Sequence, residues 1–268
     1  MKASIKKLLT GALAAFVFGG LVSSNASAAT MELALVMDGS GSISATNWNL
    51  QKAGYQAAFA SGTFYDDYIA PSPFDSLWVS AYQFATGVTQ EIVWTEITDN
   101  ASATAFGNQF ASLTQLAGGT NTELALNVAT NDILNNGVAG GKLVIDISTD
   151  GQPILCNGTC NVSPTADAID AANIARANNI TVNALGVGAG INTTFLNTLV
   201  APTGFYLTAS DYTQFANTLS DKLGREITGV PAPSALLLLA IGLIGLAVVR
   251  RQRNVVERDQ INMEAIAA

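Results

Sequence analysis

Leu33-Ala34-Leu35-Val36-Met37-Asp38-Gly39-Ser40-Gly41-Ser42 runs from five consecutive apolar residues directly into a loop that alternates glycine with oxygen-bearing side chains. The apolar run is typical of a parallel strand that is buried on both faces. The glycines allow a sharp turn, so Asp38, Ser40 and Ser42 can converge on one point instead of alternating along a strand. The stretch predicts an oxygen-rich site at the carboxyl end of a buried strand. The alternative is a turn that only caps the following helix.

The three side chains of this loop offer one carboxylate and two hydroxyls. Mg²⁺ takes oxygen ligands in near-octahedral geometry at about 2.0–2.1 Å and keeps several waters, so a protein supplies only a few side-chain oxygens. Loops at the carboxyl ends of parallel strands are also where open α/β sheets bind ligands. The loop therefore indicates a site for a hard divalent cation.

Two later segments also combine glycine with oxygen-bearing side chains at the end of a predicted strand or the start of a predicted helix. Gly118-Gly119-Thr120-Asn121-Thr122 precedes a helical pattern, and Ser148-Thr149-Asp150-Gly151 follows an apolar strand. In this order, the three segments resemble the metal-ion-dependent adhesion site of the von Willebrand factor type A (VWA) family, over about residues 31–228.

The resemblance implies a ligand set for the cation. Direct ligands are expected at Asp38, Ser40, Ser42 and Thr120, with Asp150 bound directly or through water. The cation would be Mg²⁺, with Mn²⁺ or Ca²⁺ as alternatives, and an acidic group of a partner would displace a bound water.

Asp146 lies inside the apolar strand, on the same side as Ser148 and Asp150 by two-residue alternation. A buried carboxylate is costly unless it is paired or hydrogen-bonded. Asp146 either supports the metal loops without binding the metal itself or is a structural hydrogen-bond hub without influence on the metal.

Apolar strand-like runs alternate with helical patterns along the chain, which predicts a doubly wound, mostly parallel six-stranded sheet flanked by helices, as in VWA and Rossmann-like folds. A short connection before 91–97 predicts one antiparallel edge strand. The residues at 62–76 are expected to form a loop whose aromatic side chains either line a binding surface or pack locally. The predicted strands are 31–37, 77–84, 91–97, 142–148, 180–187 and 204–208, and the predicted helices are 44–60, 102–116, 121–135, 165–178, 192–200 and 211–227.

The N-terminus has the order of a secretory signal peptide, with lysines, an apolar stretch and then Ala26-Ser27-Ala28. We expect residues 1–28 to be this peptide and residues 29–228 to form the exported VWA domain. We expect a disulfide between Cys156 and Cys160, because both lie in the exported part of the chain, where a disulfide can persist.

The C-terminal segment 229–253 joins a Pro-containing box, an apolar run at 235–249 and an arginine cluster, followed by a short polar tail at 254–268. As a helix, the apolar run reaches about 22 Å, against a hydrocarbon core of about 30 Å. The segment resembles the PEP-CTERM sorting signal that exosortases process in Gram-negative bacteria, although Ala232 replaces the usual Glu and such proteins normally end before a tail. The alternative is an ordinary single-span membrane anchor. On either reading the domain lies at the cell envelope or cell surface.

Charge and composition exclude several classes of function. Residues 30–229 contain 5 Lys or Arg and 17 Asp or Glu, a net charge of −12, so nucleic acid is not expected as a partner. The chain has no His, and therefore neither an imidazole base nor a His-containing zinc or serine-hydrolase motif. We expect a non-enzymatic domain that adheres to a protein or extracellular matrix ligand. The alternatives are a structural component of a biofilm or exopolysaccharide matrix and a metal-dependent hydrolase.

Overall fold

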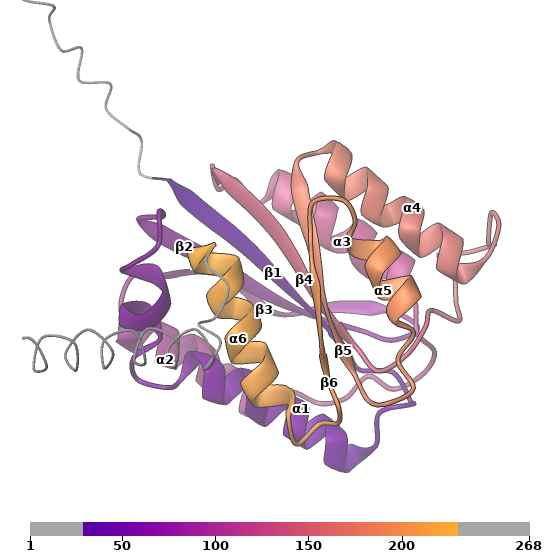
Figure 1. The fold of residues 1–268 in the computed structure, drawn as a ribbon, viewed down its shortest axis with the longest axis horizontal. Helices are drawn as coiled ribbons and strands as arrows, with labels where there is room; N and C mark the ends of the chain where they lie inside the picture. Colours follow the sequence, from indigo (N-terminus) through magenta and orange to yellow (C-terminus); the bar gives the residue numbers. More distant parts are fainter. Residues whose placement is uncertain (1–28, 230–268) are drawn as a thin grey trace, which may run out of the picture.

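The computed structural model describes residues 29–229, which form one six-stranded sheet covered on both faces by helices (Figure 1). The strand order is β3-β2-β1-β4-β5-β6, and every neighbouring pair is parallel except β2 and β3. The predicted signal peptide and nearly all of the predicted sorting segment lie outside the described residues. The strands are β1 Thr30–Asp38, β2 Ser76–Phe84, β3 Val88–Ile97, β4 Lys142–Thr149, β5 Ile180–Val187 and β6 Tyr206–Ala209.

Two helical layers enclose the sheet. Helices α1, α2 and α6 cover one face, and α3, α4 and α5 cover the other (Figure 1). Strand β1 contributes to both cores, because Leu33 and Leu35 point to the first layer while Ala34 and Val36 point to the second. The helices are α1 Ala45–Phe59, α2 Asn100–Gln109, α3 Thr122–Asn135, α4 Pro164–Ala177, α5 Thr193–Val200 and α6 Phe215–Thr228.

The predicted fold class is confirmed, including the antiparallel edge strand, which is β3. The predicted loop at 62–76 contains a short π-helix, Tyr65–Ile69, whose aromatic side chains pack locally. Phe64 is buried, and the Tyr68 hydroxyl lies 2.7 Å from the Ser220 hydroxyl on α6.

The helix predicted at 102–116 is shorter than expected. It begins at Asn100, because Asp99 and Ser102 form a capping box, and it ends at Gln109. A 3₁₀ turn follows, and the backbone is extended at Leu113. The chain leaves the helix there because the next residues bond to the first loop, where the Gln115 amide donates to the Ser40 carbonyl at 3.0 Å.

Candidate metal centre

Asp38 is the last residue of β1, and its carboxylate is fully buried. One carboxylate oxygen accepts a hydrogen bond from the Ser40 backbone N–H at 2.8 Å, and the other accepts from the Thr149 hydroxyl at 2.6 Å. Burial raises the pKa of Asp38 to about 6, although the hydrogen bonds from Ser40 and Thr149 act in the opposite direction. The backbone turn at residues 39–41 therefore holds a carboxylate whose charge is poorly solvated.

The hydroxyls of Ser40 and Ser42 connect the first predicted loop to the third, which follows β4. Their oxygens lie 3.0 Å apart, and the Ser42 hydroxyl donates to Asp150 Oδ1 at 2.8 Å. Asp150 follows β4 directly and is partly exposed, and burial raises its pKa as well. Three of the predicted ligands thus form one hydrogen-bonded chain at the carboxyl edge of the sheet.

The loop that carries Thr120 lies against the first loop. The Gly41 backbone N–H donates to the Gly118 carbonyl at 2.8 Å. Only glycine fits at position 118, because its φ is 104° and a Cβ there would lie 2.6 Å from the Thr86 hydroxyl. Thr120 is buried, and Asn121 caps α3 by accepting from the Leu124 N–H at 3.1 Å. The structure thereby brings all three predicted loops to one edge of the sheet.

Thr149 was not predicted as a site residue, yet it makes the shortest hydrogen bond to Asp38. It lies beside Asp38 because β1 pairs with β4 in parallel register, with Met37 opposite Ser148. The only sequence signal was its place in the third loop motif, since the register between two strands cannot be read from their spacing.

Asp146 is placed against α6. Lys222 donates to Asp146 Oδ1 and, at 2.5 Å, to Glu226 Oε1, and all three side chains are buried. Within residues 29–229 the second oxygen of each carboxylate has no hydrogen-bond partner. Burial raises the pKa of Glu226 to about 8. The direct contacts of Asp146 therefore belong to an ion cluster between β4 and α6.

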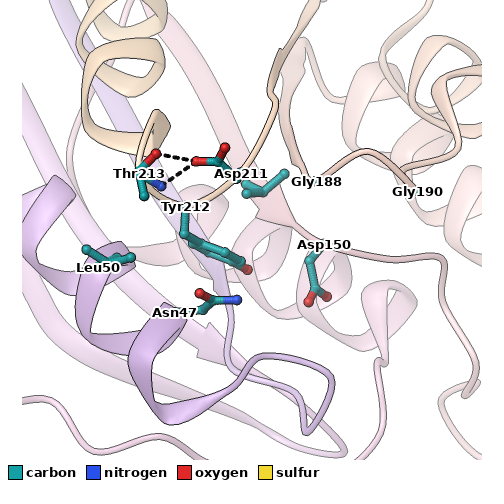
Figure 2. A pocket seen from close by; sticks show the side chains of 9 residues that line it. Asn47, Leu50, Asp150, Gly188, Gly190, Asp211, Tyr212 and Thr213 are labelled. Atoms are coloured by element: carbon teal, nitrogen blue, oxygen red, sulfur yellow. Dashed lines mark hydrogen bonds between the residues drawn. The ribbon is translucent and has the colours of Figure 1, made fainter.

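A hollow of about 290 Å³ opens beside the metal loops. Figure 2 shows the Tyr212 ring reaching between Asn47 on α1 and Asp150. The Tyr212 hydroxyl is buried without a hydrogen-bond partner among the described residues, whereas Asp211 accepts hydrogen bonds from the backbone and hydroxyl of Thr213. The edge of the sheet thus offers space next to Asp150.

The donor set fits a hard divalent cation. It combines two carboxylates with hydroxyl oxygens and contains no sulfur or imidazole. Both ion pairs formed within residues 29–229 involve Lys222, so neither Asp38 nor Asp150 has a basic partner in this part of the chain. A cation is the group that would neutralise these two charges.

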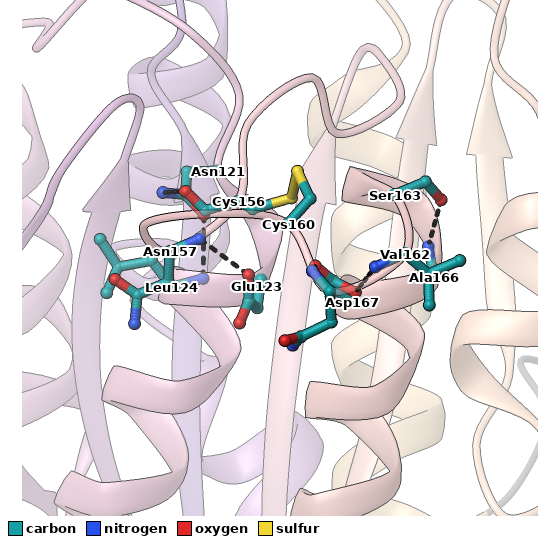
Figure 3. The surroundings of a disulfide bond; sticks show 11 residues. Asn121, Glu123, Leu124, Cys156, Asn157, Cys160, Val162, Ser163, Ala166 and Asp167 are labelled. Carbon is teal, nitrogen blue, oxygen red and sulfur yellow. Dashed lines mark hydrogen bonds between the residues drawn. A yellow bond between two sulfur atoms is a disulfide. The ribbon is translucent and has the colours of Figure 1, made fainter.

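A disulfide loop of residues 156–160 lies between the beginnings of α3 and α4 (Figure 3). Cys156 and Cys160 are joined, so their sulfur atoms are not available as metal ligands. The Asn157 N–H donates to Glu123 at 2.8 Å, and the Asn161 N–H donates to Asp167 at 2.8 Å. Both ends of the loop are therefore fixed to helices.

Sequence comparisons identify two regions. The family model described as "Protein of unknown function (DUF1194)" matches residues 28–231, and the PEP-CTERM protein-sorting motif matches residues 229–252. A search of curated proteins found no match. Within residues 29–229, no helix is both long enough and apolar enough to span a bilayer.

Solved structures with a similar fold include three VWA-type proteins. The von Willebrand factor type A protein from Catenulispora acidiphila is 17% identical, with a TM-score of 0.55 over 75% of this chain and 43% of that one. The vWF domain of the type V pili tip protein Mfa5 from Porphyromonas gingivalis is 12% identical, with a TM-score of 0.55 over 78% and 99%. Proximal thread matrix protein 1 from the mussel byssus, solved with a zinc-occupied MIDAS motif, is 16% identical, with a TM-score of 0.53 over 72% and 48%. The chain spans about half the length of the mussel thread protein, and at these identities the likeness shows a VWA-type fold.

Proposed function

The chain belongs to the DUF1194 family, and we propose that it is an exported, envelope-associated VWA domain that binds a protein or matrix ligand through a divalent cation. The cation would be held by Asp38, Ser40, Ser42, Thr120 and Asp150. The observation that carries the proposal is the cluster of oxygens at the sheet edge. Hydrogen bonds join Ser40, Ser42 and Asp150, and Asp38 accepts from the Ser40 N–H. Neither carboxylate has a basic partner within residues 29–229.

The residues of the site would contribute two kinds of oxygen ligand, charged and neutral. Asp38 and Asp150 supply two negative charges, which a divalent ion would balance, while Ser40, Ser42 and Thr120 supply neutral oxygens. A bound cation supplies a coordination position for an acidic group of the ligand. The hollow beside Asp150 gives the rest of the ligand access. Zinc in the MIDAS motif of the mussel thread protein supports this assignment, and Mg²⁺, Mn²⁺ and Ca²⁺ are the ions we test.

The ends of the chain would control where the domain works. We propose that residues 1–28 direct export and that residues 229–253 engage the sorting peptidase or the membrane, with 254–268 as a polar tail. The sorting-motif match supports the C-terminal part of this assignment. Protease accessibility of the domain on intact cells tests it, because a protected domain would contradict surface exposure.

Calorimetric titration tests the cation. Mg²⁺, Mn²⁺ and Ca²⁺ are titrated into residues 29–229 of the wild type, Asp38→Asn, Ser42→Ala and the control Asp170→Asn, whose carboxylate is exposed on α4. We expect one ion per chain in the wild type and the control, and binding at least about 10-fold weaker in the two site variants. Absence of binding in the wild type, or equal binding in Asp38→Asn, would refute the proposed site.

A further inference from the structure

A second hollow, of about 350 Å³, lies between β3, α3 and the disulfide loop and shares no residue with the candidate metal centre. Its volume falls in the range of small-molecule sites, which begins at about 300 Å³. Four amide side chains surround two apolar ones there. We call this hollow the amide groove, and the six side chains are those of Gln90, Asn127, Asn131, Asn157, Leu124 and Val128.

The helical spacing of α3 produces this arrangement. Leu124 and Val128 are four residues apart, as are Asn127 and Asn131, so the helix presents an apolar row beside an amide row. The groove is therefore lined by an apolar row and a neighbouring amide row of the same helix.

Most of the amide groups in the groove have unused hydrogen-bonding capacity. Within residues 29–229, the side chains of Asn127 and Asn157 make no hydrogen bond. The Asn131 side chain accepts from Asn135 at 3.2 Å, and its own NH₂ group donates to nothing in the same part of the chain. An amide is at once a donor and an acceptor, which matches groups that also do both.

The wall of the groove on the β-sheet side is held in place by Asp132. One of its oxygens accepts hydrogen bonds from the Tyr82 hydroxyl, from Trp94 Nε1 at 2.6 Å and from the Gln90 amide at 3.3 Å. Burial is the main cause of the raised pKa of Tyr82, so the tyrosine stays a neutral donor to Asp132. The Gln90 amide is thereby oriented before any ligand arrives.

The disulfide loop fixes the opposite end. Figure 3 shows Asn157 above the first turn of α3, next to Leu124. The Asn157 N–H donates to Glu123 at 2.8 Å, and the Asn121 amide donates to the Cys156 carbonyl at 3.3 Å. Groups that are ordered in the free protein lose less conformational entropy on binding. This gives the Cys156–Cys160 bond a role in positioning Asn157.

The chemistry of the groove selects its ligand. None of its lining residues is basic, and the domain carries a net charge of −12, so an anionic ligand would be repelled. Hydroxyl groups donate and accept hydrogen bonds as the amides do, and a pyranose ring also has an apolar face of C–H groups for Leu124 and Val128. We propose that the amide groove binds a neutral saccharide unit of a polysaccharide, without a metal ion.

Native affinity electrophoresis of the full chain, purified in a detergent without a sugar headgroup, tests this proposal. The gels contain a neutral glucan, mannan or galactan, or the polyanion polygalacturonate, and each gel is run with chelator and, in parallel, with divalent cation in place of chelator. The test variant is Asn127→Ala with Asn131→Ala, and the control is Asn197→Ala, which removes an exposed amide from α5. Alanine favours a helix at all three positions, so the fold is retained.

We expect at least one neutral polysaccharide to retard the wild type and Asn197→Ala equally. Dissociation constants should be about 10-fold or more higher in the double variant, since two hydrogen bonds are lost, and a few-fold higher in Cys156→Ser with Cys160→Ser. No retardation by any neutral polysaccharide would overturn the proposal, as would equal retardation of the double variant. If retardation appears only without chelator, the saccharide binds at the metal centre, and the amide groove is refuted while the proposed function stands.

Discussion

Asp38→Asn should stabilise the metal-free domain at neutral pH. In the folded protein burial raises the pKa of Asp38 from 3.8 to about 6, and each pKa unit corresponds to about 1.4 kcal/mol, so holding this group ionised costs about 3 kcal/mol. A raised folded-state pKa gives stability that is complete below about pH 3.8 and is lost as the pH rises through about 6. The amide is neutral throughout. Thr149 can accept from it, because the Thr149 hydroxyl has the Gly151 carbonyl at 3.1 Å as another acceptor.

Urea unfolding of both proteins between pH 4 and 7.5, with chelator, measures the effect. The two free energies of unfolding should be similar near pH 4, and the variant should exceed the wild type by about 3 kcal/mol near pH 7. Cation at 100 times its dissociation constant should add about 2.7 kcal/mol to the wild type and little to the variant. Asp170→Asn, which changes an exposed carboxylate, serves as control. A difference that does not change with pH would refute the argument from burial.

Three further substitutions test the packing around the site, each by urea unfolding at pH 7. Lys222→Met leaves the side chains of Asp146 and Glu226 buried without a cation, and should lower the free energy of unfolding by about 3–5 kcal/mol. Gly204→Ala places a Cβ 1.9 Å from the Val182 carbonyl oxygen and should cost about 3 kcal/mol or more. Tyr212→Phe removes a buried hydroxyl that has no partner within residues 29–229, and should raise stability by about 1 kcal/mol.

Matched variants distinguish these effects from general damage. Glu226→Gln should cost less than Lys222→Met, because Lys222 keeps its ion pair with Asp146 in this variant and burial already raises the pKa of Glu226. Gly87→Ala should change stability by less than about 0.5 kcal/mol, since nothing lies within 4 Å of its Cβ position. Tyr55→Phe should destabilise, because the Tyr55 hydroxyl donates to Ser148 at 3.0 Å. The packing would be contradicted if Glu226→Gln lowered the free energy of unfolding more than Lys222→Met, or Gly87→Ala more than Gly204→Ala. It would also be contradicted if Tyr212→Phe were less stable than Tyr55→Phe.

Local sequence determined most of the elements. The apolar run before Asp38 predicted a strand buried on both faces, and β1 packs into both cores. The helix predicted at 102–116 was too long, because its end depends on hydrogen bonds from Gln115 to the first loop rather than on local preference. The sequence did not decide whether the aromatic side chains at 62–76 line a binding surface or pack locally. Their contacts with the core and α6 identify them as packing residues.

By itself, the sequence determined which residue types follow the buried strands: glycines where the backbone must turn, and carboxylates and hydroxyls beside them. Only the tertiary structure decided that Thr149 bonds to Asp38, that Lys222 pairs with Asp146, and that the disulfide loop closes a groove on α3. The reason is physical. Turning and burial depend on neighbouring residues and hydrophobic periodicity. Strand register and the choice of helix over each face depend on packing between distant segments, such as Asp38 and Thr149, 111 residues apart, and Tyr68 and Ser220, 152 residues apart.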